Sequence, residues 1–147
     1  MKKRYLVGGV VLLMLVAAYL SLPRAPRERK PESLAALAGE VGLAFPPGSR
    51  LLGIHRESGM DDLVKFKLEM RAQDVPGFLA AAGAEPSAMS AGNVAYFGPD
   101  RDFWDPRRAR GFRGVQMRRE QTFRSLNLGV AEEHDGSVSV YIMEHGD

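Results

Sequence analysis

The side chains that could bind a metal ion or act as a nucleophile are scattered along this chain. The three histidines are His55, His134 and His145. His134 and His145 stand at opposite ends of one predicted strand, about 26 Å apart at about 3.3 Å per residue, so they cannot share a metal ion. No serine adjoins a histidine in the order of a known catalytic set, and the chain has no cysteine. The sequence therefore predicts no catalytic residue, no metal and no cofactor.

Two pairs of neighbouring carboxylates, Asp61-Asp62 and Glu132-Glu133, have side chains suited to acid–base catalysis or calcium binding. Each pair flanks a predicted hairpin turn, and the alternating acids, glycine and distal glutamate of a calcium loop are missing. We therefore expect both pairs to be solvated at turns. An enzyme of unrecognised class remains an alternative, with His55 and Asp61 as its candidate pair.

The segment from Asp100 to Pro106 contains the single tryptophan of the chain, and a run of arginines follows it. Aromatic and arginine side chains are common in the centres of protein interfaces. In the alternative interpretation, the aromatic rings fold back over the open face of a sheet and the charges stay in water. We predict a partner-binding surface within residues 96–124, formed by Phe103, Trp104, Arg107, Arg108 and Arg110.

Basic charge is concentrated at the start of the chain. The first 30 residues carry seven basic side chains and one acidic side chain, whereas residues 31–147 carry 13 basic and 17 acidic side chains. Basic residues beside an apolar run interact with anionic lipid headgroups, and an acidic domain is a poor binder of phosphate backbones. We therefore expect no nucleic-acid partner.

Residues 6–22 form a run of 17 residues without a charged side chain. As a helix this run spans about 26 Å, and a bilayer core of about 30 Å is crossed by roughly 17–25 residues. The pattern predicts a single transmembrane helix within a membrane anchor of residues 1–22. The alternative is a signal peptide cleaved near Val16-Ala17-Ala18. The residues expected in the two membrane interfaces are Lys2, Lys3, Arg4, Tyr5 and Tyr19.

The flanking charges indicate how the anchor is oriented. Three basic residues lie directly before the apolar run, whereas the four after it are spread over seven residues and diluted by Glu28. We expect the N-terminus in the cytoplasm and the domain on the outer or periplasmic side of the inner (plasma) membrane. A cytoplasmic domain, or secretion after cleavage, are the alternatives. Residues 23–31 form a linker rich in proline and arginine, and the preference for arginine over lysine indicates a bacterial protein.

Residues 32–147 are predicted to form one soluble α+β domain. Their order indicates a four- to five-stranded antiparallel sheet with two helices packed on one face. In the strand at 62–71, apolar residues alternate with charged ones, which predicts one buried and one wet face. Apolar periodicity predicts helices at 32–43 and 74–82, and strands at 50–56, 62–71, 125–133 and 137–144, with a further strand at 113–120.

Two local features of this domain remain open. Asp74 is expected to cap the helix that follows it. Residues 84–114 lack a regular pattern, which indicates a functional loop or a short unrecognised element near residues 94–97.

The function that these features favour is binding rather than catalysis. We predict a membrane-anchored, non-enzymatic interaction protein of the bacterial envelope, held in the bilayer by residues 6–22 and contacting a partner protein through residues 96–124. A small-ligand or lipid-binding domain at the membrane surface is the alternative.

Overall fold

A computed structural model of the chain describes residues 32–59, 62–119, 124–133 and 135–146. The predicted anchor and linker, residues 1–31, lie outside the described residues, as do Asp61 and His134. Within the described part of the chain, no helix has the length and apolar character needed to cross a membrane.

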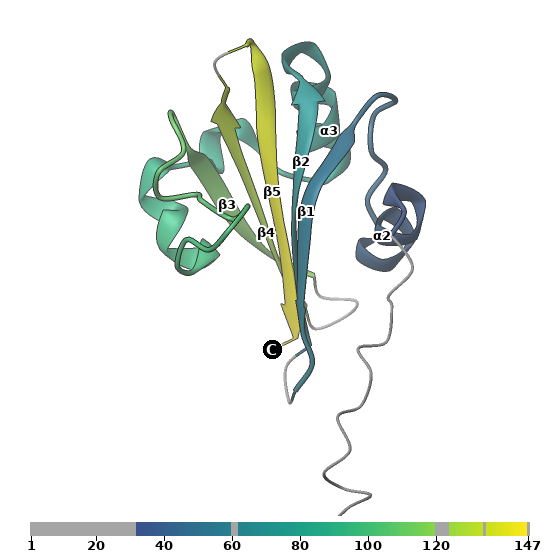
Figure 1. The fold of residues 1–147 in the computed structure, drawn as a ribbon. Coiled ribbons are helices and arrows are strands. Elements are labelled where there is room, and N and C mark those ends of the chain that lie inside the picture. The colour runs from purple at the N-terminus through teal and green to yellow at the C-terminus, as the bar shows by residue number, and fades with distance from the viewer. Residues whose placement is uncertain (1–31, 60–61, 120–123, 134, 147) are drawn as a thin grey trace, which may run out of the picture. The chain divides into compact units, whose positions relative to one another are not determined.

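Five antiparallel strands form one sheet, which confirms the predicted α+β class (Figure 1). The last strand of the chain, β5, lies in the centre between β2 and β4, so an N-terminal hairpin and a C-terminal three-stranded unit share one sheet. In spatial order the strands are β1 (Arg50–Glu57), β2 (Leu63–Arg71), β5 (Ser137–Gly146), β4 (Arg124–Glu132) and β3 (Arg113–Arg119).

The first described helix, α2 (Leu34–Val41), agrees with the sequence prediction. The Ser33 side chain accepts a hydrogen bond from the backbone N–H of Ala36, which satisfies one donor of the first turn. Gly42 ends the helix with a φ of 60°, a conformation that glycine adopts at little cost.

The second helix, α3 (Val75–Ala81), also lies where the sequence predicts it, but the expected cap is wrong. Asp74 has a helical backbone and its side chain makes no capping hydrogen bond. Its carboxylate instead binds Arg71 at 2.6 Å, because a 3-10 turn (Ala72–Asp74) joins β2 directly to the helix.

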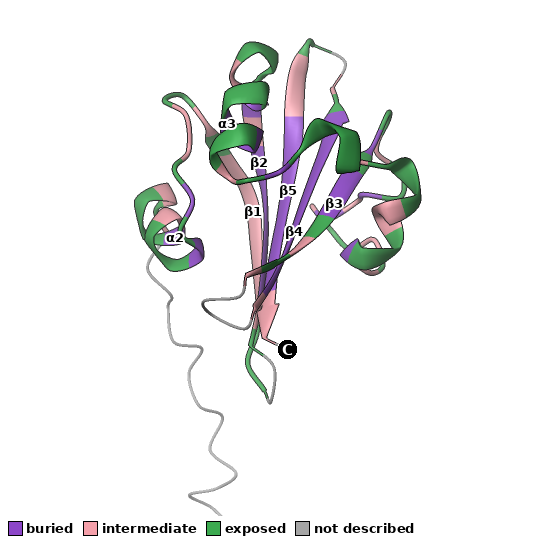
Figure 2. Cartoon of the chain, turned by 180° about the vertical axis from the view of Figure 1, so that it is seen from behind, coloured by how far each residue is buried: buried purple, intermediate pink, exposed green. Residues whose placement is uncertain are grey.

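Both helices cover the same face of the sheet, as predicted (Figure 2). Leu37 and Val41 of α2 and Phe78 of α3 are buried there. They share one core with alternate residues of the central strands: Val64, Phe66, Leu68, Met70, Leu126, Leu128, Val140 and Ile142.

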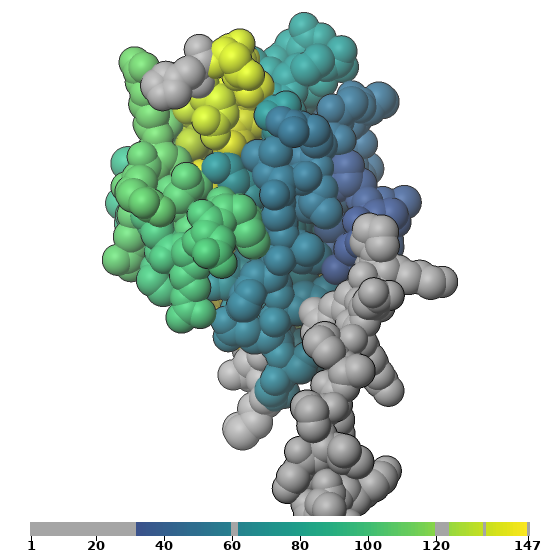
Figure 3. All heavy atoms as spheres, in the orientation of Figure 1, coloured from purple at the N-terminus to yellow at the C-terminus, as the bar shows by residue number. Residues whose placement is uncertain are grey.

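The prediction that the other face of β2 is wet is wrong for Lys65 and Lys67, whereas Glu69 is half-buried and Arg71 is exposed. Lys65 and Lys67 lie on that face and are only 7% and 8% exposed. The reason is the segment of residues 84–112, here called the cover segment. Ala84 and Met89 at its start still pack in the helix-side core, and the part from Val94 onward lies over the other side of the sheet (Figure 3). Its Phe97, Trp104 and Phe112 form a second core with residues of β4 and β5: Ala131, Tyr141 and Met143.

The cover segment contains the short element expected near residues 94–97. A 3-10 helix, η3 (Ala91–Phe97), begins at Ser90, whose side chain accepts from the N–H of Gly92. A shorter 3-10 turn, η2 (Pro86–Ala88), precedes it. These elements satisfy the backbone of a stretch that shows no helical or strand period in sequence.

Glycines on β3 and β4 let the aromatic rings approach the sheet. Gly114 and Gly129 are directly opposite each other across the two strands. A Cβ atom on Gly114 would lie 2.6 Å from the Phe97 ring, and one on Gly129 would lie 2.6 Å from the Phe112 ring. Larger residues at these positions would push the cover segment away.

Gly129→Ala should therefore lower the free energy of unfolding by about 1–3 kcal/mol, because overpacking forces the ring or the strand to move. Gly39→Ala in α2 is the matched control, since nothing lies within 4 Å of its added Cβ. Alanine there should stabilise the helix by about 0.5–1 kcal/mol. Chemical denaturation of the purified protein measures both changes, and equal stability of the two variants would contradict the close packing.

Candidate functional site

The cover segment is fixed to the sheet by a polar cluster around Asp105. One carboxylate oxygen, Oδ1, accepts from Lys67 Nζ at 2.9 Å and from the Tyr141 hydroxyl at 2.7 Å. Lys67 also lies 3.7 Å from Glu133, which accepts from the Ser139 hydroxyl. Glu133 is therefore part of this cluster, and the expectation that the pair Glu132-Glu133 is merely solvated at a turn is wrong for Glu133.

The pKa shifts of Asp105 and Tyr141 define the protonation states of this cluster. Burial acts to raise the pKa of Asp105, but hydrogen bonds from Tyr141 and Lys67 outweigh it and lower the pKa. Burial and the neighbouring carboxylate of Asp105 raise the pKa of Tyr141. The carboxylate thus stays charged and the phenol stays a donor, so the three groups act as a permanent attachment.

Trp104 contacts the sheet rather than solvent. It is 2% exposed, its indole N–H donates to the carbonyl of Phe97 at 2.8 Å, and its ring lies edge-on to Tyr141. Phe103 is half-buried, with its ring over Gly53 of β1. The alternative interpretation of the two rings, that they cover the sheet, is the arrangement that the structure shows.

The three arginines predicted to bind a partner are exposed. Arg108 binds Asp100 at 3.1 Å, and the same carboxylate accepts from the backbone N–H of Arg107 at 3.0 Å. Within the part of the chain that the structure describes, the side chains of Arg107 and Arg110 have no acidic partner, and neither has that of the exposed Arg113. We call Arg107 and Arg110, both on the cover segment, the arginine surface; Arg113 lies on β3 and lines a hollow with Val75 and Pro76 of α3.

A small hollow opens where the cover segment meets β1 and β2. Its volume is about 120 Å³, and we call it the Lys65 hollow. Lys65 Nζ lies 5.8 Å from the centre of the Trp104 ring. The backbones of Arg101 and Trp104 exchange two hydrogen bonds, both 2.6 Å long, which close a tight turn beside the hollow. The lining residues are His55, Lys65, Arg101, Asp102, Phe103 and Trp104.

The environment of Lys65 disfavours its charge. Burial lowers the pKa of the Lys65 ammonium, and Arg101 lowers it further, while Glu57 acts in the opposite direction. Among the described residues, no acceptor forms a hydrogen bond or an ion pair with this ammonium. Lys67, two residues along the same strand, differs because two acids of the domain face it.

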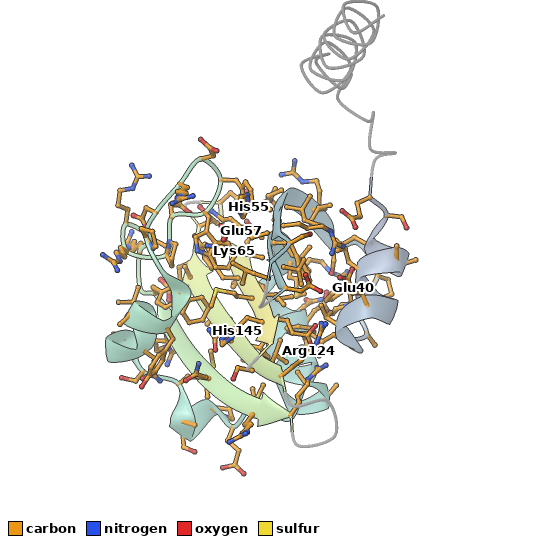
Figure 4. The ribbon with its side chains drawn as sticks, turned by 90° about the horizontal axis from the view of Figure 1, so that it is seen from below. Glu40, His55, Glu57, Lys65, Arg124 and His145 are labelled. Carbon is orange, nitrogen blue, oxygen red and sulfur yellow. The ribbon has the colours of Figure 1, made fainter. Side chains whose placement is uncertain are left out.

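The histidines do not form a metal site in the described part of the chain, where no group of three or more histidine or acidic side chains is arranged for a metal ion. His55 binds Glu57 at 2.8 Å through Nε2. Asp61, its expected partner, lies outside the described residues. His145 is on β5, separated from β1 by the whole width of β2. Figure 4 shows His55, Glu57 and Lys65 grouped together, away from α2.

A second hollow, of about 160 Å³, lies near α2, and the two arginines that line it, Arg56 and Arg124, are each bound to an acid of the domain. Arg56 binds Glu40 at 2.6 Å, and the hydrogen bond lowers the pKa of Glu40 against the opposing effect of burial. Arg124 binds the 2%-exposed Glu144 at 3.1 Å. Figure 4 shows Glu40 and Arg124 on the α2 side. Neither arginine of this hollow is therefore an unmatched cation of the kind that Lys65 provides in the other hollow.

The comparisons with known proteins give no family: no family model, curated protein or solved structure matches this chain. The site is therefore defined by its geometry alone. Its two parts are the arginine surface on the cover segment and the Lys65 hollow, which the cover segment forms together with β1 and β2. The sequence predicted the arginines, but it did not indicate Lys65, which stands in an ordinary alternating strand.

Replacing each buried lysine by methionine should separate their roles. Lys67→Met should lower the free energy of unfolding by about 1–2 kcal/mol, because Asp105 loses its cation. Lys65→Met should leave it equal or higher at pH 7, since it removes a buried ammonium that has no acidic partner. Denaturation at a series of pH values measures both.

The same pH series also tests whether the charge of Lys65 causes the difference in stability between Lys65→Met and the wild type. The folded pKa of Lys65 is below the unfolded value of 10.5, so the charge penalty is fully present below the folded pKa and disappears as the pH rises to about 10.5. Any increase in the free energy of unfolding of Lys65→Met over the wild type should disappear across that pH interval. A loss of stability at pH 7 as large as that of Lys67→Met would show that Lys65 has a partner within the chain.

Proposed function

We propose that this chain is a membrane-tethered, non-enzymatic binding protein of the bacterial envelope that contacts an acidic partner protein through the arginine surface. The observation that carries the proposal is the unequal pairing of arginines. Arg50, Arg71 and Arg124 each bind an acid of the domain, whereas Arg107 and Arg110 have none among the described residues.

The fixed cover segment supports this proposal. A surface that is already ordered loses little conformational entropy when it binds, so more of the interaction energy appears as affinity. Asp105 binds Lys67 of β2, and the neighbouring Trp104 ring packs edge-on against Tyr141 of β5, so both attach the segment to the sheet. Trp104 therefore acts as a scaffold, and the contact with the partner falls to Phe103 and the exposed arginines.

The tether follows from the apolar run at residues 6–22, which is long enough to cross a bilayer as a helix. Basic residues on both sides would interact with lipid headgroups. A domain tied to the membrane by a short linker is confined near other envelope proteins, and this raises the effective concentration at which it meets a partner.

Fractionation should recover the intact chain, with Met1 attached, in the membrane fraction, because 17 uncharged side chains favour lipid over water. Detergent should release it, and high salt should not. A reporter joined to the C-terminus should be active only outside the cytoplasm. Intact chain in the soluble fraction would refute the tether, and a cytoplasmically active reporter would refute the orientation.

Crosslinking in membranes tests the arginine surface. The double variant Arg107→Ala and Arg110→Ala should lose most of the partner that the wild type captures, because two unpaired cations are removed. Arg108 is kept, since its bond to Asp100 holds the loop. Capture by the wild type should weaken as the salt concentration rises, because exposed charges are screened.

The matched control is Arg50→Ala with Arg71→Ala, which removes the same charge from exposed ion pairs elsewhere on the domain. Such pairs contribute little to stability, so the control should fold and should capture the partner normally. Equal capture by both double variants would remove the arginine surface from the proposal.

A further inference from the structure

Two lysines of β2 provide an internal comparison. Lys65 and Lys67 lie on the same face of the strand, and their exposed fractions are 7% and 8%. Lys67 Nζ is 2.9 Å from Asp105 and 3.7 Å from Glu133. Lys65 is equally buried and has no such acceptor among the described residues. Lys65 instead lines the open hollow, so its ammonium is available to an anionic ligand there.

The space beside Lys65 limits what can bind there. A volume of about 120 Å³ is well below the roughly 300–1,000 Å³ of sites for drug-sized ligands. It has room for a charged group with a few carbon atoms. Phe103 and Trp104 supply aromatic walls, and Arg101 supplies a second cation at the opening.

The charges around the hollow favour a single negative charge. Lys65 and Arg101 are positive, while Asp102 lies on the exposed rim and Glu57 is bound to His55. A dianionic phosphate would be repelled by both carboxylates. A carboxylate carries one charge, and its hydrocarbon part can rest against the aromatic rings.

We propose that the Lys65 hollow binds a carboxylate group, with Lys65 and Arg101 as its donors and Phe103 and Trp104 against its hydrocarbon part. The carboxylate is either that of a small free acid or an acidic side chain of the partner. Only the second source rests on the proposed function. In both cases a carboxylate of the ligand accepts from the Lys65 ammonium, as the carboxylate of Asp105 accepts from Lys67.

Trp104 provides a direct probe, because it is the single tryptophan of the chain and it lines the hollow. Sodium propionate, titrated into the full chain in detergent micelles at constant ionic strength, should change the tryptophan fluorescence saturably. Sodium chloride at the same ionic strength should not. Absence of a saturable change, or saturation by inorganic phosphate and not by propionate, would overturn the proposal.

Variants locate the site. Lys65→Met should weaken propionate binding at least tenfold, and its denaturation midpoint shows whether it is folded. Arg101→Ala, at an exposed position, should weaken binding several-fold without affecting the fold. The variant Arg50→Ala with Arg71→Ala, at exposed ion pairs elsewhere on the domain, should bind propionate like the wild type, because neither residue lines the hollow. Unchanged binding in both Lys65→Met and Arg101→Ala would refute the assignment.

The same reagents distinguish the two sources. If propionate reduces crosslinking to the partner, the carboxylate in the hollow is a side chain of that partner. If propionate binds and crosslinking is unaffected, the hollow takes a free acid. Both results support the carboxylate site. Failure to capture any partner would remove the proposed function alone, because the fluorescence titration does not involve a partner.

Discussion

The contact between the cover segment and the second face of the sheet determines most of what is specific to this molecule. Phe97, Trp104 and Phe112 pack there against Tyr141 of the central strand β5. Aromatic rings of this kind bury roughly 150–250 Å² each, so together they form a core of their own. Without this contact, a five-stranded sheet with helices on one side only would expose an apolar stripe along β4 and β5.

The hydrophobic effect is non-directional, so a polar contact adds a defined attachment point to the apolar packing of the segment. The carboxylate of Asp105 fixes the position of the cover segment on the sheet. This carboxylate binds groups from two adjacent strands, Lys67 of β2 and Tyr141 of β5, which are directly opposite each other in the sheet. Since Phe103 and Trp104 come just before Asp105, the same bonds set the walls of the Lys65 hollow. Structure and candidate site therefore share one anchoring point.

The sequence predicted the elements of the fold but not its second layer. The helices and the five strands follow from local periodicity and turn residues, for which β5 is a clear example with Asp135-Gly136 before it. The cover segment has no period, because 3-10 turns and single aromatic contacts do not repeat. Because the cover segment was not recognised, the alternating lysines of β2 predicted a solvent-exposed face. The glycines at 53, 114 and 129 were a usable signal, since each allows an aromatic ring to approach a strand.

The candidate site shows the same division between local and non-local information. Exposed arginines after a tryptophan are visible as composition, and the sequence predicted them as a binding surface. The need of Lys65 for an acceptor is not visible, because it depends on which acids the fold brings to its face. Asp105 is 38 residues away from Lys67 along the chain and reaches it only after the cover segment has folded back.

Charge distribution gives the domain a selectivity that its net charge hides. Residues 31–147 carry more acids than bases, yet several of those acids are engaged by Lys67, Arg119 and Arg124 within the fold. Among the described residues, the cations without an acidic partner include Arg107 and Arg110 on the cover segment. A long polyanion would be repelled by the rest of the domain, whereas a compact acidic surface meets only the arginines. Under the proposed function, such a field would orient an acidic partner before contact, and the carboxylate site proposed in the Lys65 hollow would add a short-range requirement.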